Sequence, residues 1–219
     1  MKMVTKWLLA LVLPFFMATA VLAQDYQAGK EYLVLANPQP TSSGDKIEVV
    51  ELFWHGCPHC YRLEPLITEW QTSKPDDVVF IRMPAVLGPN WELYGKAYYT
   101  AELLGVEDKI HLALFDALHN DRKKIRDEAA LQALFVEQGV SAEDFRNTFN
   151  SFAVNVKINN AKQMTRRYAI TGVPSVIVNG KYSTSATQAG SNENIIKVMD
   201  FLIAQERQQA IAAPAATSR

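Results

Sequence analysis

Residues 47–63 have the sequence IEVVELFWHGCPHCYRL, and this stretch decides the fold. Its first seven residues are mostly β-branched or apolar, which predicts a buried strand. After the second cysteine, apolar side chains recur at the spacing of a helix, as Leu63, Leu66, Ile67 and Trp70. The pattern therefore predicts a strand that runs directly into a helix at the two cysteines.

The cysteines occupy the start of this predicted helix. Pro58 suits the first helical position, where its missing N–H costs no hydrogen bond. Cys57 then falls at the N-cap, and Cys60 lies one turn later on the same face. Unpaired N–H groups and the positive end of the helix dipole favour a thiolate at Cys57, and His59 adds a donor or a positive charge. We expect Cys57 to be the nucleophile and Cys60 the buried resolving thiol.

The first 23 residues have the pattern of a signal peptide. Two lysines precede an uncharged apolar run that starts at Trp7 and closes with Val-Leu-Ala at residues 21–23. We expect cleavage after Ala23 and export to the periplasm, and a membrane anchor is the alternative for a run of this length. Without this leader the chain has 20 basic and 23 acidic residues (22 minus 2, against 23), which argues against a nucleic-acid partner.

Only two cysteines, three positions apart, occur in the chain. Export places them where disulfides persist. A structural disulfide gains most by closing a long loop, and the chain-entropy model gives about 1.9 kcal/mol for ~4 residues against ~4.7 kcal/mol for ~100. The pair is therefore a poor staple, and reversible dithiol chemistry is the better interpretation.

A metal-binding protein is the rival class. His55 and His59 add two imidazoles to the two thiols, and these ligand types suit zinc or copper(I). All four lie within six residues, however, whereas zinc sites usually bring ligand pairs from separate segments. We therefore expect no metal site.

The rest of the pattern surrounds the cysteines with further strands and helices. A short strand is expected at 32–35, and another at 78–82 after a turn, which gives a strand–helix–strand unit around the dithiol. The later segments are several helices between Pro89 and about residue 150, a longer helix over about 151–171, a strand at 175–178, an Asn-Gly hairpin signal at 179–180 and a final helix from about residue 192.

In this order of elements the chain resembles the thioredoxin-fold thiol-disulfide oxidoreductases, and within them the bacterial DsbA proteins. The segments that carry the resemblance are Glu51-Leu52-Phe53, Cys57-Pro58-His59-Cys60, the helical insertion, Gly172-Val173-Pro174 and the hairpin Asn179-Gly180-Lys181-Tyr182. The resemblance implies an α/β thioredoxin fold with an inserted helical domain. Its expected parts are 24–88 and 151–206 for the thioredoxin fold, 89–150 for the inserted helices, and 207–219 for a flexible tail.

The resemblance also implies roles for single residues. In DsbA-like proteins the first cysteine, here Cys57, forms a mixed disulfide with the substrate, and Cys60 resolves it. Pro174 matches a cis-proline whose loop faces the dithiol, and Val173 before it pairs with an extended substrate. Glu51 matches a buried acid that accepts the proton of Cys60. Beyond the cysteine pair itself, the resemblance implies no cofactor.

Other interpretations of these residues stay open. Val173-Pro174 is equally the entrance of a strand, where proline is allowed at the first position. Glu51 faces solvent if its strand is only half buried. His111 and His119, in the helical block, are expected to lie on the surface.

The resemblance implies a periplasmic dithiol oxidase that donates its disulfide to newly exported, unfolded proteins. A membrane quinone reductase of the DsbB type would then reoxidise it. An isomerase of the dimeric DsbC type needs a dimerisation domain, for which the roughly two dozen residues between Ala23 and Ile47 leave too little room. A periplasmic reductase of the cytochrome-maturation type, or a copper- or zinc-binding metallochaperone, are the alternatives.

Overall fold

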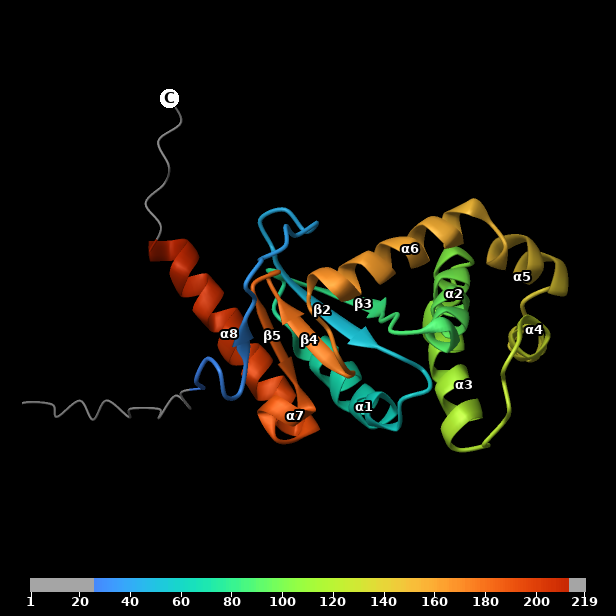
Figure 1. Ribbon diagram of the computed structural model, residues 1–219, viewed down its shortest axis with the longest axis horizontal. Helices are drawn as coiled ribbons and strands as arrows, with labels where there is room; N and C mark the ends of the chain where they lie inside the picture. Colours follow the sequence, from blue (N-terminus) through green and yellow to red (C-terminus); the bar gives the residue numbers. More distant parts are fainter. Residues whose placement is uncertain (1–25, 213–219) are drawn as a thin grey trace, which may run out of the picture.

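A five-stranded mixed sheet forms the centre of the protein (Figure 1), whose computed structural model describes residues 26–212. The strand order is β1-β5-β4-β2-β3; β2 is parallel to β3 and antiparallel to β4. All seven residues of β2 are buried, which confirms the strand predicted before the cysteines. The strands are β1 (Leu33–Val34), β2 (Ile47–Phe53), β3 (Val78–Pro84), β4 (Ser175–Val178) and β5 (Tyr182–Ser185).

Two long helices, α1 and α8, pack against each other and beside the sheet. Their apolar side chains, among them Leu63 and Leu202, join those of β2 and β4 in one buried cluster. This core holds the start of α1, and with it the dithiol, at the end of β2. The helices of this part are α1 (Pro58–Ser73), the short α7 (Ala186–Ala189) and α8 (Asn192–Ala212).

The remaining helices are those of the predicted insertion, 89–150, and α6 after it, which was expected as part of the thioredoxin fold. In Figure 1 they lie as a block at one side of the sheet, and α6 runs from this block back to the sheet. The block has a core of its own, which includes Leu114, Leu131 and Phe145. The helices are α2 (Pro89–Leu103), α3 (Glu107–His119), α4 (Glu128–Glu137), α5 (Ala142–Phe149) and α6 (Phe152–Arg167).

Two predicted segments differ from the structure. Helix α6 ends at Arg167 rather than near residue 171, because Ala169 has a positive φ of 53° and turns the chain so that Tyr168 and Ile170 are buried. Residues 207–212 are the last part of α8 and not a tail, since Arg207 pairs with Asp77 through contacts of 2.6 and 2.7 Å.

The signal peptide predicted at 1–23 and the rest of the predicted tail, 213–219, lie outside the described residues. Of the helices found between residues 26 and 212, none has the length and apolar character to cross a membrane.

Candidate active site

Both cysteines lie where the strand–helix pattern predicted them. Cys57 is the N-cap residue of α1, with φ −94° and ψ 116°, and Pro58 begins the helix. Residue Cys57 is 9% exposed, whereas Cys60 is fully buried. Both are free thiols. Both cysteines are thus largely buried, and Cys57 at the helix terminus is the more accessible of the two.

Their surroundings shift the two thiols in opposite directions. A hydrogen bond from the Cys60 thiol, together with the backbone N–H groups of Cys60 and His59 and the His59 charge, lowers the pKa of Cys57 to about 6, although burial opposes this. Burial raises the pKa of Cys60 well above its ordinary value, and the Cys57 sulfur and Glu51 act in the same direction. At neutral pH the reduced site therefore holds one thiolate, at Cys57.

His59 and Pro58 are both exposed at the first turn of α1. The His59 Nδ1 atom lies 2.9 Å from the Arg62 guanidinium, which can only donate, so Nδ1 accepts this hydrogen bond when the His59 ring is neutral. His59 thus lies in the same helical turn as Cys57, as the sequence predicted. The backbone N–H and the ring of His59 both lower the pKa of Cys57.

The turn before Cys57 depends on a glycine. A Cβ atom added to Gly56 would lie 2.4 Å from the Trp54 ring, closer than real contacts allow. That ring stacks on Trp91 of α2, with centroids 4.4 Å apart and an interplanar angle of 15°. The carbonyl oxygen of Trp54 accepts a hydrogen bond from the Cys57 N–H at 2.9 Å. Gly56 therefore lets the loop and the tryptophan pack closely beside the nucleophilic position.

The loop before β4 faces the dithiol. The Val173–Pro174 peptide bond is cis. The Cys57 sulfur lies 3.5 Å from the Val173 carbonyl oxygen, across 116 positions of sequence, and donates a hydrogen bond to it when protonated. A groove of about 1040 Å³ extends from His59 past this loop, along residues 33–36, 168–175 and 183–193. His59, Val173 and Pro174 thus line an open groove, and Cys57 adjoins it through its contact with Val173.

Glu51 is buried, 1% exposed, and the alternative that it faces solvent is wrong. Neither of its carboxyl oxygens has a hydrogen-bond partner within residues 26–212. Burial, and then the Glu64 carboxylate, raise the pKa of Glu51 to about 8, against the opposing charge of Arg82. An unpaired carboxylate is costly in such a site, so Glu51 is mostly a neutral acid at pH 7.

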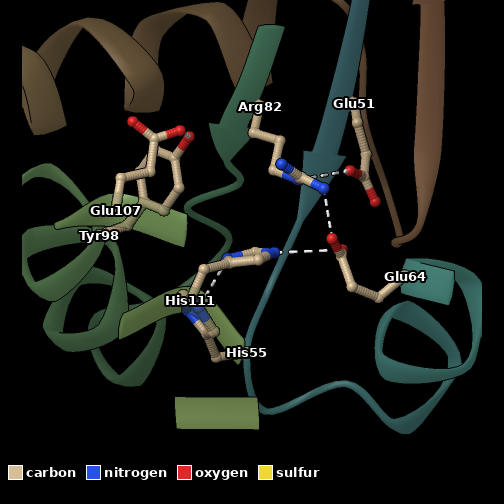
Figure 2. A network of polar contacts seen from close by, with 7 residues as sticks. All are labelled: Glu51, His55, Glu64, Arg82, Tyr98, Glu107 and His111. Carbon is tan, nitrogen blue, oxygen red and sulfur yellow. Dashed lines mark hydrogen bonds and ion pairs between the residues drawn. The ribbon is translucent and has the colours of Figure 1, made fainter. Parts of the chain in front are cut away.

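Glu51 lies at one end of a polar network, which Figure 2 shows. The Arg82 Nε atom lies 3.6 Å from Glu51 Oε2, and the end of the same guanidinium pairs with Glu64. On its other side Glu64 contacts His111, which in turn contacts His55, each at 3.1 Å. The prediction that His111 lies on the surface is wrong, because this side chain is 3% exposed and has polar partners inside the protein.

His119 also differs from the surface position expected for it. It is partly buried, and its Nε2 atom lies 2.7 Å from the His55 carbonyl oxygen. The Tyr61 ring stacks on it at a centroid distance of 5.1 Å. Helix α3 therefore contacts the chain on both sides of the cysteines.

Sequence reasoning missed Glu64 and Arg82, although both left a signal. Glu64 follows Cys60 by four residues, which places the two on one face of α1. Arg82 lies directly opposite Glu51 in the parallel pair of β2 and β3. An arginine in an otherwise apolar strand, beside an acid in the neighbouring buried strand, indicates a buried ion pair.

The ligand set of the rival metal site is not assembled. His55 hydrogen-bonds His111 instead of approaching the cysteines as a fourth ligand. In the part of the chain from residue 26 to 212, no group of three or more His, Cys, Asp or Glu side chains is arranged to hold a metal ion.

Comparison with known proteins now adds to this geometry. The sequence profile described as DSBA-like thioredoxin domain matches residues 79–195. The thiol:disulfide interchange protein DsbA of Pseudomonas aeruginosa is 44% identical over 191 residues, which are 87% of this chain and 90% of that protein. The chain belongs to the DsbA family. This membership makes it a thiol-disulfide oxidoreductase, in agreement with the α/β thioredoxin fold and the paired cysteines.

Other DsbA proteins show the same relationship. The thiol:disulfide interchange protein DsbA of Burkholderia cepacia is 34% identical over 84% of this chain and 87% of its own length. The crystal structure of Pseudomonas aeruginosa DsbA covers 86% of this chain and 98% of its own, with a TM-score of 0.82 and 45% identity. DsbA from Xylella fastidiosa gives a TM-score of 0.78 at 29% identity, over 84% of this chain and 98% of its own. The inserted helices and the sheet are thus both part of the family fold.

Proposed function

We propose that the protein is a dithiol oxidase of the periplasm, which donates the Cys57–Cys60 disulfide to newly exported, unfolded proteins. The substrate is attached during the reaction through a mixed disulfide at Cys57. A membrane quinone reductase of the DsbB type restores the disulfide. The export signal expected at residues 1–23 supports the location.

The opposite environments of the two thiols are the observation that carries this proposal. The site stabilises a thiolate at Cys57, with a pKa of about 6, and only the reduced protein has that thiolate. A low cysteine pKa at this position is already the known pattern of DsbA proteins, so its direction here agrees with the family. Because the thiolate stabilises only the reduced form, it increases the tendency of the oxidised form to pass its disulfide to other thiols.

The sulfur chemistry follows from the positions of the two cysteines. A substrate thiolate attacks the Cys57 sulfur, the Cys57–Cys60 bond breaks, and Cys60 leaves as a thiolate. Glu51, a neutral acid at pH 7, supplies a proton to Cys60. A second substrate thiolate then attacks the first substrate sulfur, which forms the substrate disulfide and releases Cys57 as a thiolate. In the reverse direction Glu51 accepts the proton of Cys60.

The groove beside Cys57 supports an extended polypeptide as the substrate. Val173 lies at its inner end, where its backbone can pair with an extended chain while Pro174 keeps the loop against the dithiol. The groove combines apolar residues such as Leu33 and Val34 with polar ones such as Ser183. Such a mixed, open surface suits unfolded chains of varied sequence.

Trapping of the intermediate tests the proposal. Cys60→Ser, produced in a periplasm, should accumulate mixed disulfides with exported proteins, because the sulfur that resolves them is gone. The matched control Cys57→Ser should accumulate none. A Cys60→Ser variant that traps no exported protein, or trapping by Cys57→Ser instead, would contradict the assignment.

A further inference from the structure

A pair of buried histidines connects the inserted helices to the acids behind Cys60. His111 of α3 has one partner at each ring nitrogen: Nε2 lies 3.1 Å from Glu64 Oε2, and Nδ1 lies 3.1 Å from His55 Nε2. Figure 2 shows His111 between these two side chains. The dithiol reaction described above makes no use of this pair.

The carboxylate at one end fixes the direction of the hydrogen bond between Glu64 and His111. The pKa of Glu64 is lowered because the His111 hydrogen bond and the Arg82 charge outweigh burial, so Glu64 can only accept. His111 therefore donates from Nε2. In a neutral His111 ring, Nδ1 then accepts the single proton on His55 Nε2. Burial, with His111 and His119 nearby, keeps the pKa of His55 well below its ordinary value, so that the His55 ring is neutral.

The Arg82 guanidinium contacts two acids in this cluster, Glu64 and Glu51. Arg82 uses its terminal nitrogen for Glu64, while its Nε atom lies 3.6 Å from Glu51 Oε2. The contact to Glu64 is the closer of the two. A carboxylate with one fewer donor would draw the guanidinium further toward itself, because a buried charge needs all the partners within reach. The hydrogen bond from His111 to Glu64 therefore leaves part of the Arg82 charge for Glu51.

We propose that His111 is a positioning residue of the dithiol reaction: by holding Glu64, it keeps Arg82 shared between Glu64 and Glu51. Through His111, the inserted helical block would thus adjust the proton affinity of Glu51, the acid that exchanges a proton with Cys60. This inference rests on the proposed role of Glu51. The titratable and charged groups that face the network are Glu64 and Cys60 of α1, Arg82 of β3, Tyr98 of α2, Glu107 and His119 of α3, and His55 before α1.

Two substitutions at His111 separate this role from simple packing. Glutamine places its amide nitrogen near the position of Nε2 and keeps the donor to Glu64, whereas asparagine reaches only the position of Nδ1. The titration of Glu51 is followed by the infrared carboxyl band of the oxidised protein, which is assigned through its loss in Glu51→Gln. In His111→Asn the titration should move upward by roughly one pH unit, because the positive charge near Glu51 recedes. In His111→Gln it should stay near the wild-type position.

Two further variants provide the controls. Glu64→Gln removes the competing acid, leaves Arg82 to Glu51, and should move the Glu51 titration downward. His119→Asn removes a hydrogen bond from the same helix to the His55 carbonyl, which does not reach the acids, and should leave the titration in place. A general loss of packing is not expected to move the Glu51 titration upward in His111→Asn and downward in Glu64→Gln.

Three results would overturn the proposal: a folded His111→Asn variant whose Glu51 titration is unchanged or lowered, equal shifts in His111→Asn and His111→Gln, or a Glu64→Gln variant without a downward shift. If His111→Asn does not fold, His111→Leu takes its place, because leucine also lacks a donor for Glu64 and should likewise raise the Glu51 titration. The titration needs no substrate, so its outcome is independent of whether the protein oxidises exported proteins.

Discussion

Raising the pH from 5 to 7 should stabilise the reduced protein relative to the oxidised one by about 1.4 kcal/mol. The two forms differ in the presence of the Cys57 thiolate, which the disulfide lacks. The pKa of Cys57 is lowered to about 6 in the folded protein, and the value in the unfolded chain is ~8.5. For a lowered pKa, the stabilisation is fully present above the unfolded pKa and is lost as pH falls through the folded pKa.

The magnitude follows from these two values. Each unit of pKa is worth about 1.36 kcal/mol, so at pH 7, one unit above the folded pKa, the thiolate contributes about 1.4 kcal/mol, and at pH 5 almost nothing. At pH 8 the contribution rises to about 2.6 kcal/mol. Cys57 is only 9% exposed, so solvent screening removes little of it.

The disulfide itself adds a stabilisation of the oxidised protein that does not change with pH. For a loop of ~4 residues the chain-entropy model gives about 1.9 kcal/mol. The thiolate contribution rises with pH while the disulfide contribution stays constant, so the pH dependence of the stability difference reports the thiolate.

Denaturant unfolding of both forms at pH 5, 6, 7 and 8 measures this difference. Most other titrating groups are the same in the two forms, so their contributions to the pH dependence cancel when the stability of the oxidised protein is subtracted from that of the reduced protein. Reduced Cys57→Ser is the matched control, and it should lack the gain between pH 5 and 7. A difference between the reduced and oxidised forms that is flat, or that shrinks as pH rises, would refute the thiolate argument.

Three further outcomes are expected. Pro174→Ala should leave the fold intact but slow the release of substrate from Cys57, so that mixed disulfides accumulate on non-reducing gels; unchanged turnover would count against the loop. Gly56→Ala should cost about 1–3 kcal/mol in urea unfolding and alter the near-UV circular dichroism, because its Cβ displaces the Trp54 ring. The exported protein should begin at Gln24 by intact mass, and a retained leader would contradict the signal peptide.

Local sequence patterns were sufficient for the strand–helix junction at the cysteines. The apolar run of β2, the proline after Cys57 and the helical spacing after Cys60 all depend on neighbouring residues, and the structure has each of them in place. The resemblance to DsbA proteins then indicated the inserted helices and the loop at Pro174, which periodicity alone could not place beside Cys57.

The buried polar network could not be predicted in the same way. His111 follows Ile110 on an amphipathic helix, and such a position is buried or exposed according to what packs against that edge of the helix. Its partner Glu64 lies 47 positions away, on a helix of the other part of the fold. The end of α8 was missed for a similar reason, since the Arg207–Asp77 pair spans 130 positions.

Disulfide transfer to a reduced, unfolded protein is the most direct measurement of the central claim. Oxidised protein is mixed with the reduced substrate at neutral pH, quenched with an alkylating reagent at intervals, and both partners are weighed by mass spectrometry. The account predicts that the substrate loses a pair of thiols while Cys57 and Cys60 become alkylated in equal amount. A substrate that keeps its thiols, while Cys57 and Cys60 stay unmodified, would contradict it.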